Sequence, residues 1–129
     1  MLNDATLYAV FPANDAERLK QFFSEKLGLE PVEERMGMPF YEIGGTKFFI
    51  YESTYAGTNE ATVASFAVSD LRPVVDDLKS KGVVFEHYDM PGTTLDGDIH
   101  VMETDGIAMK SVWFKDTEGN ILNINESAA

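Results

Sequence analysis

The sequence lacks cysteine altogether among its 129 residues. This absence excludes disulfides, thiolate metal sites and cysteine nucleophiles. Basic residues are also scarce, with 10 Lys and Arg against 22 Asp and Glu and a formal net charge of -12. Because such a charge repels phosphate backbones and anionic membranes, we expect neither nucleic acid nor membrane as a partner. The acidic residues are spread along the chain, which favours plain solubility over attraction of a cationic ligand.

Long hydrophobic runs are missing too. No segment approaches the roughly 20 consecutive apolar residues that span a bilayer, and the N-terminal segment lacks the pattern of a secretion signal. We therefore expect a cytoplasmic protein. Hydrophobic residues make up 44% of the chain and charged residues 25%, as in an ordinary globular protein. The length suits one domain with a real core better than two domains.

One pattern occurs twice along the chain. It consists of a strand ending at an acidic helix cap, an amphipathic helix, a glycine, and further strands that close on a glycine turn. Asp15 and Gly28 mark the helix in the first copy, and Asp70 and Gly82 mark it in the second. Repeats of this length indicate duplicated structural units. We therefore predict one α+β domain over residues 1–129, with βαβββ modules at about 1–54 and 62–129 and a linker at about 55–61.

Local patterns place the individual elements. The helices are expected to run from the two acidic caps to Leu27 and Lys81. Gly44 and Gly45 are expected to form a tight hairpin turn with positive φ at both residues. The segment 91–106 contains three glycines and is expected to be a loop or flap. The predicted strands cover residues 6–12, 29–35, 39–43, 46–52, 62–68, 83–88, 107–115 and 120–125.

Several motifs resemble those of the vicinal oxygen chelate (VOC) superfamily, which includes glyoxalase I, extradiol dioxygenases, fosfomycin resistance enzymes and bleomycin resistance proteins. The motifs are the duplicated pattern, Leu-Gly-Leu at 27–29, Phe-Ala-Val-Ser-Asp at 66–70, Tyr-Asp-Met-Pro-Gly at 88–92 and, most specifically, Trp-Phe-Lys-Asp-Thr-Glu-Gly-Asn at 113–120. The resemblance implies tandem βαβββ modules forming a cupped mixed sheet of the glyoxalase/bleomycin resistance type. It also implies a homodimer that binds a small organic ligand.

The resemblance further implies where a metal would bind. Metal-dependent members use His, Gln or Glu from the first and fifth strands and Glu from the fourth and eighth. The matching positions here are Tyr8, Val63, Phe49 and Asn123. None supplies the carboxylate or imidazole groups that a divalent cation needs. We therefore expect no metal and no cofactor, and glyoxalase or dioxygenase chemistry loses its main support.

The remaining titratable residues offer weaker candidates for catalysis. Of the two histidines, His87 is expected to have a structural or surface role, and His100 is expected to be a solvated loop residue that could cover a ligand. Strand parity and turn chemistry indicate that the notable carboxylates are surface residues or turn formers. These carboxylates are Glu42, Glu52, Glu86, Asp116 and Glu118.

Period-two counting predicts which side chains line the cup. Trp113 or Phe114 should join them. The residues on the inner side are Tyr8, Val10, Phe49, Tyr51, Val63, Ser65, Ile121, Asn123 and Asn125. From these we predict ligand contacts by Tyr8, Phe49, Tyr51, Ser65, Trp113, Asn123 and Asn125. The same aromatic side chains would instead fill the cup as core if no cavity remained.

Three functions are compatible with this pattern. The first is a metal-free protein that binds a hydrophobic or planar compound in an aromatic cup, as bleomycin resistance proteins do. The second is a lyase or dioxygenase-like enzyme that uses metal-free acid–base residues or a noncanonical metal set, such as His87, His100 and a glutamate. The third is a scaffold with a filled cup that only dimerises. The sequence favours the first.

Overall fold

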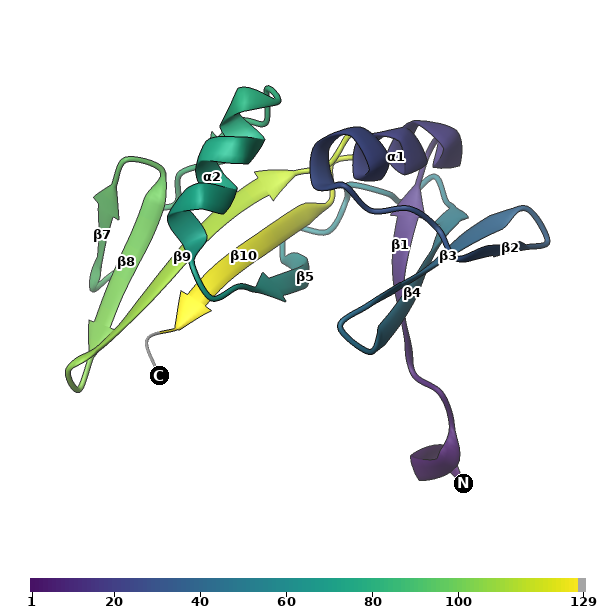
Figure 1. The fold of residues 1–129 in the computed structure, drawn as a ribbon, viewed down its shortest axis with the longest axis horizontal. Helices are drawn as coiled ribbons and strands as arrows, with labels where there is room; N and C mark the ends of the chain where they lie inside the picture. The colour runs from purple at the N-terminus through teal and green to yellow at the C-terminus, as the bar shows by residue number, and fades with distance from the viewer. Residues whose placement is uncertain (128–129) are drawn as a thin grey trace. The chain divides into compact units, whose positions relative to one another are not determined.

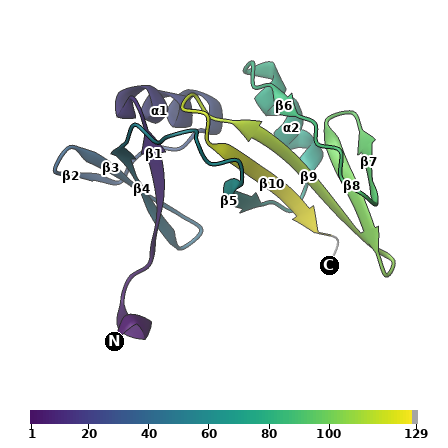
Figure 2. The ribbon, with the colours of Figure 1, turned by 180° about the vertical axis from the view of Figure 1, so that it is seen from behind.

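A computed structural model describes residues 1–127 of the chain (Figure 1). The chain forms two compact units. Unit 1 comprises Met1–Asn59 and Thr117–Asn120, and unit 2 comprises Glu60–Asp116 and, of the described residues, Ile121–Ser127. Within each unit a helix packs against a mixed sheet, and Figure 2 shows the same elements from behind. The α+β class predicted from the sequence is confirmed.

Unit 1 is a βαβββ module. Its sheet has the order β1-β4-β3-β2, in which β1 is parallel to β4 and the other neighbours are antiparallel. The predicted strand at 29–35 is too long, because only its last three residues pair with β3. The elements are η1 (Leu2–Asp4), β1 (Tyr8–Ala13), α1 (Ala16–Phe22), a π-helical turn η2 (Phe23–Leu27), β2 (Glu33–Arg35), β3 (Met38–Ile43) and β4 (Thr46–Glu52).

The ends of the first helix follow from its capping residues. The side chain of Asp15 accepts a hydrogen bond from the backbone N–H of Arg18 at 3.1 Å, which satisfies an otherwise unpaired donor of the first turn. Gly28 ends the helix in the left-handed conformation, at φ 69°. Gly44 and Gly45 form the predicted turn between β3 and β4, with φ values of 55° and 80°.

Aromatic rings make most of the core of unit 1. Phe23 is fully buried, and its ring centroid lies 5.2 Å from that of Phe11, 5.5 Å from Tyr41 and 6.0 Å from Phe48. The hydroxyl of Tyr41 is buried without a hydrogen-bond partner among residues 1–127. Burial, assisted by nearby glutamates, raises the pKa of Tyr41 to about 12, so its side chain stays neutral at physiological pH.

Unit 2 repeats the arrangement of unit 1 with additions. Its sheet has the order β5-β10-β9-β8-β7, and β5 is parallel to β10 as β1 is to β4. β8 therefore takes the place of β2, β7 adds an edge strand, and β6 pairs separately with β9. The elements are β5 (Thr62–Ala67), α2 (Leu71–Ser80), β6 (Phe85–Glu86), β7 (Thr93–Asp96), β8 (Ile99–Thr104), β9 (Ile107–Lys115) and β10 (Ile121–Ser127).

The segment 91–106 is not the loop or flap that the sequence suggested. It contains the antiparallel hairpin of β7 and β8, in which Thr93 pairs with Met102 and Asp96 with Ile99. Its glycines lie just outside or between these strands, with positive φ values at Gly92, Gly97 and Gly106. They therefore mark turns of a regular element. The predicted strand at 83–88 is correspondingly reduced to the two residues of β6.

The second helix is fixed by a hydrogen bond at its N-terminus and by its buried apolar stripe. Asp70 is its N-cap residue, but its side chain makes no cap hydrogen bond, and the N–H of Leu71 instead donates to the carboxylate of Glu126 at 2.6 Å. Leu71, Val75 and Leu78 are buried where α2 meets β9 and β10. No helix among residues 1–127 is long and apolar enough to cross a membrane.

The segment Thr117–Asn120 is tied to unit 1 through a buried carboxylate. Glu118 accepts hydrogen bonds from the Arg18 guanidinium at 2.8 and 2.9 Å and from the N–H of Asp15 at 2.9 Å. The Thr117 hydroxyl also donates to it, at 2.8 Å. These bonds lower the pKa of Glu118 to about 2, with the Arg18 hydrogen bond as the largest cause. The expectation that Glu118 is merely a turn former is therefore wrong.

The same segment lies unusually close to Gly57. A side chain at Gly57, where φ is 75°, would overlap the carbonyl oxygen of Glu118, and one at Gly119 would lie 3.1 Å from the Gly57 Cα. The Asn120 side chain adds a hydrogen bond to the carbonyl of Pro12 at 2.9 Å. Glycine at position 57 is thus required both by backbone conformation and by close approach.

Candidate functional site

Each sheet has one face that its helix does not cover, called here the helix-free face. In unit 2, Trp113 of β9 is the direct strand partner of Asn123 of β10, which in turn pairs with Ser65 of β5. Phe114 and Leu122, the next residues along these strands, are fully buried with the core residues of α2. Because side chains alternate between faces, Trp113 lies on the helix-free face and Phe114 does not.

Three of the residues predicted for the site form a hydrogen-bonded network on this face. The Ser65 hydroxyl donates to Asn123 Oδ1 at 2.6 Å, and the Asn125 amide donates to Ser65 Oγ at 2.7 Å and to Asn123 Oδ1 at 3.1 Å. Asn123 also donates to the carbonyl of Val112 at 3.2 Å and is 6% exposed. The network therefore presents uncharged amide and hydroxyl groups in fixed positions.

An aromatic cluster adjoins this network. The Trp113 ring meets the rings of His100 and Tyr88 edge to face, at centroid distances of 5.0 and 5.6 Å. The Trp113 indole N–H donates to the Thr62 hydroxyl at 3.1 Å, which fixes the ring plane. The helix-free face of unit 2 thus combines a large apolar ring with neutral polar groups, the usual composition of a small-molecule site.

His100 differs most from its predicted place. It lies in β8 and is 2% exposed, so the expectation of a solvated loop histidine is wrong. Its Nε2 accepts a hydrogen bond from the backbone N–H of Tyr88 at 3.0 Å. The sequence could have revealed this position only through the alternation Ile-His-Val-Met at 99–102, which the surrounding glycines obscured.

His87 is a surface residue. Its ring is half exposed and its Nε2 lies 2.7 Å from Asp98, which also binds Lys79 at 2.9 Å. These two contacts lower the pKa of Asp98, the His87 hydrogen bond contributing most. An exposed histidine that is hydrogen-bonded to a carboxylate is an ordinary feature of a protein surface.

The helix-free face of unit 1 is aromatic. Tyr8 contacts Phe40 and Phe49 edge to face at 5.7 and 5.9 Å, and the latter two rings stack at 4.8 Å. The Arg35 guanidinium lies 4.9 Å from the Phe40 ring centroid. Tyr51, the remaining predicted residue of this unit, lies on β4 and is 41% exposed. A small cleft of about 60 Å³ adjoins Tyr8 and Phe40.

The residues at the positions where the resemblance implies metal ligands do not suit a metal ion. Tyr8 and Phe49 belong to the aromatic group of unit 1, while the Asn123 side chain of unit 2 is engaged in its hydrogen-bond network and Val63 has no donor atom. Within the described part of the chain, no three His, Asp or Glu residues are grouped so that they could hold a metal ion. We therefore derive no chemistry through a metal here.

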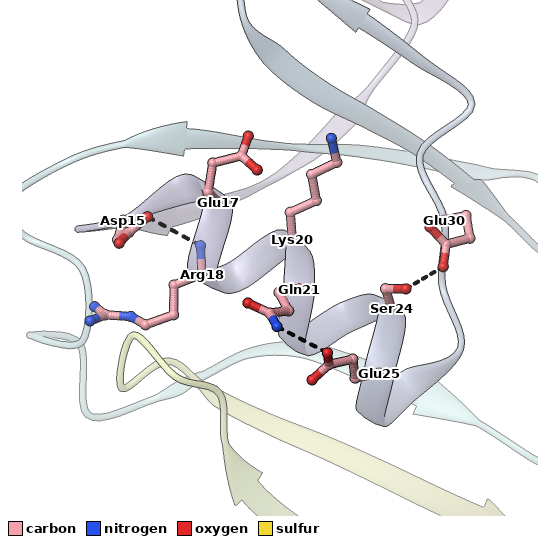
Figure 3. Close-up of a pocket in the computed structure, with 8 residues that line it drawn as sticks. All are labelled: Asp15, Glu17, Arg18, Lys20, Gln21, Ser24, Glu25 and Glu30. Carbon is pink, nitrogen blue, oxygen red and sulfur yellow. Dashed lines mark hydrogen bonds between the residues drawn. The ribbon is translucent and has the colours of Figure 1, made fainter.

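Larger hollows lie over the helices and carry no predicted site residue. The groove along α1, about 510 Å³, is lined by charged and polar side chains, some of which are hydrogen-bonded to one another (Figure 3). Figure 3 shows the Asp15 cap, the Gln21 to Glu25 bond at 2.9 Å and the bond from Ser24 to Glu30. A second hollow of about 440 Å³ lies at the start of α2. The polar side chains of the first hollow and the charged side chains of the second distinguish both from an apolar ligand site.

Comparison with known proteins yields structural matches but no sequence family. No protein-family model matches the chain, and no curated protein matches it. A glyoxalase/bleomycin resistance protein/dioxygenase from Alicyclobacillus acidocaldarius matches with a TM-score of 0.72 and 14% identity, over 98% of this chain and 93% of that one.

Two further solved structures are similar. A lactoylglutathione lyase from Agrobacterium tumefaciens has a TM-score of 0.63 and 17% identity over 95% of this chain and 93% of its own. The fosfomycin resistance protein FosX from Mesorhizobium loti has a TM-score of 0.65 and 12% identity over 97% and 93%. At such low identity the matches establish the fold alone. The chain therefore has the fold of the vicinal oxygen chelate superfamily, as its sequence motifs predicted.

Proposed function

We propose that this protein binds a hydrophobic or planar organic compound without a metal ion and without transforming it. The observation that carries the proposal is the makeup of the helix-free faces. Aromatic rings and neutral hydrogen-bonding groups lie there, including at the positions where metal-dependent members carry metal ligands. The proposal keeps the homodimer and the cytoplasmic location that the sequence led us to expect.

The ligand contacts that we propose are the residues predicted from the sequence. In unit 2, Trp113 would supply apolar contact area while Ser65, Asn123 and Asn125 orient polar groups of the ligand. In unit 1, Tyr8, Phe49 and Tyr51 would offer an aromatic surface that belongs to that unit alone. Because the network and the indole ring are already held by hydrogen bonds, little conformational entropy would be lost on binding.

The enzyme alternative has weaker support. Its noncanonical metal set would need His87, His100 and a glutamate together, but the His87 ring is turned to Asp98 and His100 Nε2 accepts a backbone N–H. The two rings are 6.3 Å apart between centroids. The lyase and fosfomycin resistance activities in the names of the structural neighbours belong to those proteins. The filled scaffold alternative predicts that no compound binds.

Intrinsic fluorescence tests the proposal, because Trp113 is the only tryptophan of the chain. We expect at least one member of a panel of aromatic compounds to change the emission saturably, with a dissociation constant below about 100 μM, or about 5.5 kcal/mol of binding energy. Asn123→Ala should weaken that binding by about tenfold, since it removes a buried hydrogen-bond partner worth about 1 to 2 kcal/mol.

The control is Asn3→Ala, which changes an exposed asparagine of η1 in unit 1 and should leave the dissociation constant unchanged. Absence of saturable binding across the panel would contradict the proposed function. Equal affinity of the wild type and Asn123→Ala for the compound would show that the ligand does not bind at the amide network.

A further inference from the structure

Three polar atoms in one part of unit 2 are buried without a hydrogen-bond partner in the described chain. They are the hydroxyl of Tyr88, Oγ1 of Thr93 and Nδ1 of His100. Buried polar groups in folded proteins are almost always paired, because an unpaired one loses its bonds to water without replacement. The three unpaired groups belong to Tyr88, to Thr93 of β7 and to His100 of β8. Together they indicate that a ligand binds in this part of unit 2.

The hydrogen bond at the other ring nitrogen assigns the proton of His100. Nε2 accepts from the backbone N–H of Tyr88 at 3.0 Å, so it carries no proton. The neutral imidazole then holds its proton on Nδ1. His100 is thus a buried donor that has no acceptor within residues 1–127.

A pocket of about 350 Å³ adjoins these groups. Its lining includes Tyr88 and Thr93, whose hydroxyl groups are the two unpaired ones. Leu95, the strand partner of His100, also lines it. Besides lining this pocket, the Tyr88 ring contacts the rings of His100 and Trp113, at centroid distances of 6.2 and 5.6 Å. Tyr88 therefore occupies a position that an aromatic ring of similar size would fill.

Tyr88 can leave this position without breaking a hydrogen bond of its side chain. Its hydrogen bond to His100 is made by the backbone, so rotation about the side-chain bonds leaves that bond in place. Its hydroxyl has no partner inside and would regain water by turning outward. Rotation would open the space beside Trp113 and expose the Nδ1–H of His100.

We propose that the ligand is an aromatic compound with a neutral hydrogen-bond acceptor, such as a ketone or amide oxygen, on or next to its ring. The ring replaces that of Tyr88 beside Trp113, and the oxygen accepts a hydrogen bond from His100 Nδ1–H. A neutral acceptor suits the site better than a carboxylate, because Asp89 lines the pocket and the chain carries a net charge of -12. This inference rests on the proposed function and adds the class of compound.

Acetophenone and ethylbenzene provide a matched test, because they share ring and shape and differ in the carbonyl. Binding can be followed by NMR through the indole N–H signal of Trp113. For the wild type we expect acetophenone to bind about tenfold more tightly than ethylbenzene, as expected when an unpaired buried donor gains an acceptor. His100→Phe, which keeps a flat ring but has no donor, should reduce this preference to within about twofold.

His100→Asn is the rescue variant, because its amide can place an N–H near the position of Nδ1. This variant should still bind acetophenone about fivefold more tightly than ethylbenzene. If the variants fail to fold, the imidazole 15N signals of His100 in the wild type provide the test. The Nδ1 signal should shift when acetophenone is added and should not shift with ethylbenzene. Equal binding of both compounds to the wild type, or an unchanged preference in His100→Phe, would overturn the inference and leave the proposed function standing. Binding of neither compound at millimolar concentration would also overturn the inference, whereas the proposed function would fall only if the whole panel of aromatic compounds failed to bind.

Discussion

Glu118→Gln is expected to lower the free energy of unfolding at pH 7 by about 3 kcal/mol and the melting temperature by about 10 °C. The carboxylate is buried and accepts hydrogen bonds from Arg18, from the N–H of Asp15 and from Thr117. Folding lowers the pKa of Glu118 from 4.5 to about 2, and a shift of this size corresponds to about 3 kcal/mol of unfolding free energy. The neutral amide loses the charge and cannot accept all of these bonds. Urea unfolding of both proteins measures the difference.

The pH dependence gives an independent check. Because the folded-state pKa is depressed, the stabilisation is present above about pH 4.5 and is lost as the pH falls toward 2. The difference in unfolding free energy between the wild type and Glu118→Gln should therefore shrink as the pH falls from about 4.5 toward 2. Glu103→Gln, an exposed glutamate of β8, is the control and should change the unfolding free energy by less than about 0.5 kcal/mol. Equal effects of the two substitutions would show that the Glu118 contacts do not stabilise the protein.

Gly57→Ala is expected to cost about 3 kcal/mol of unfolding free energy or more. The residue has φ of 75°, and the new methyl group would overlap the carbonyl oxygen of Glu118 and approach the Gly119 Cα at 3.2 Å. Both obstacles are backbone atoms, so no side chain can rotate away to make room. Thermal unfolding monitored by circular dichroism reports the loss.

Gly37→Ala separates the two causes of this effect. Gly37 also lies in unit 1 and has a similar φ of 79°, but nothing lies within 4 Å of a Cβ placed there. It should therefore show only the conformational cost, about 1 kcal/mol. If Gly57→Ala were no worse than this control, the close approach of the segment Thr117–Asn120 to Gly57 would be refuted.

The fold could be predicted because its signals are local. The spacing of Leu19 and Phe23, the Asp15 cap and the Gly44-Gly45 turn each determine a nearby element, and the duplicated pattern then gives the module. Strand parity likewise placed Ser65, Asn123 and Asn125 on one face, where their side chains form the observed network. Ligand binding by these residues stays a prediction.

The features missed by the sequence depend on distant residues. Glu118 looks like a turn residue until Arg18, 100 positions earlier, is brought against it. His100 looks exposed because glycines surround its strand, and its burial depends on Tyr88 and Trp113 from other segments. Tertiary contacts of this kind leave no periodic trace along the chain, so propensity and turn chemistry could not reveal them.

Native mass spectrometry of protein purified without chelator tests the central claim most directly, because one spectrum reports subunit number, metal content and retained organic mass. We predict a dimer without stoichiometric metal that keeps, or gains on incubation with acetophenone, the mass of an organic compound. The expectation of a metal-free site comes from Tyr8, Phe49, Val63 and Asn123 at the positions of the family's ligands. One tightly bound metal ion per chain in the active protein would contradict the account.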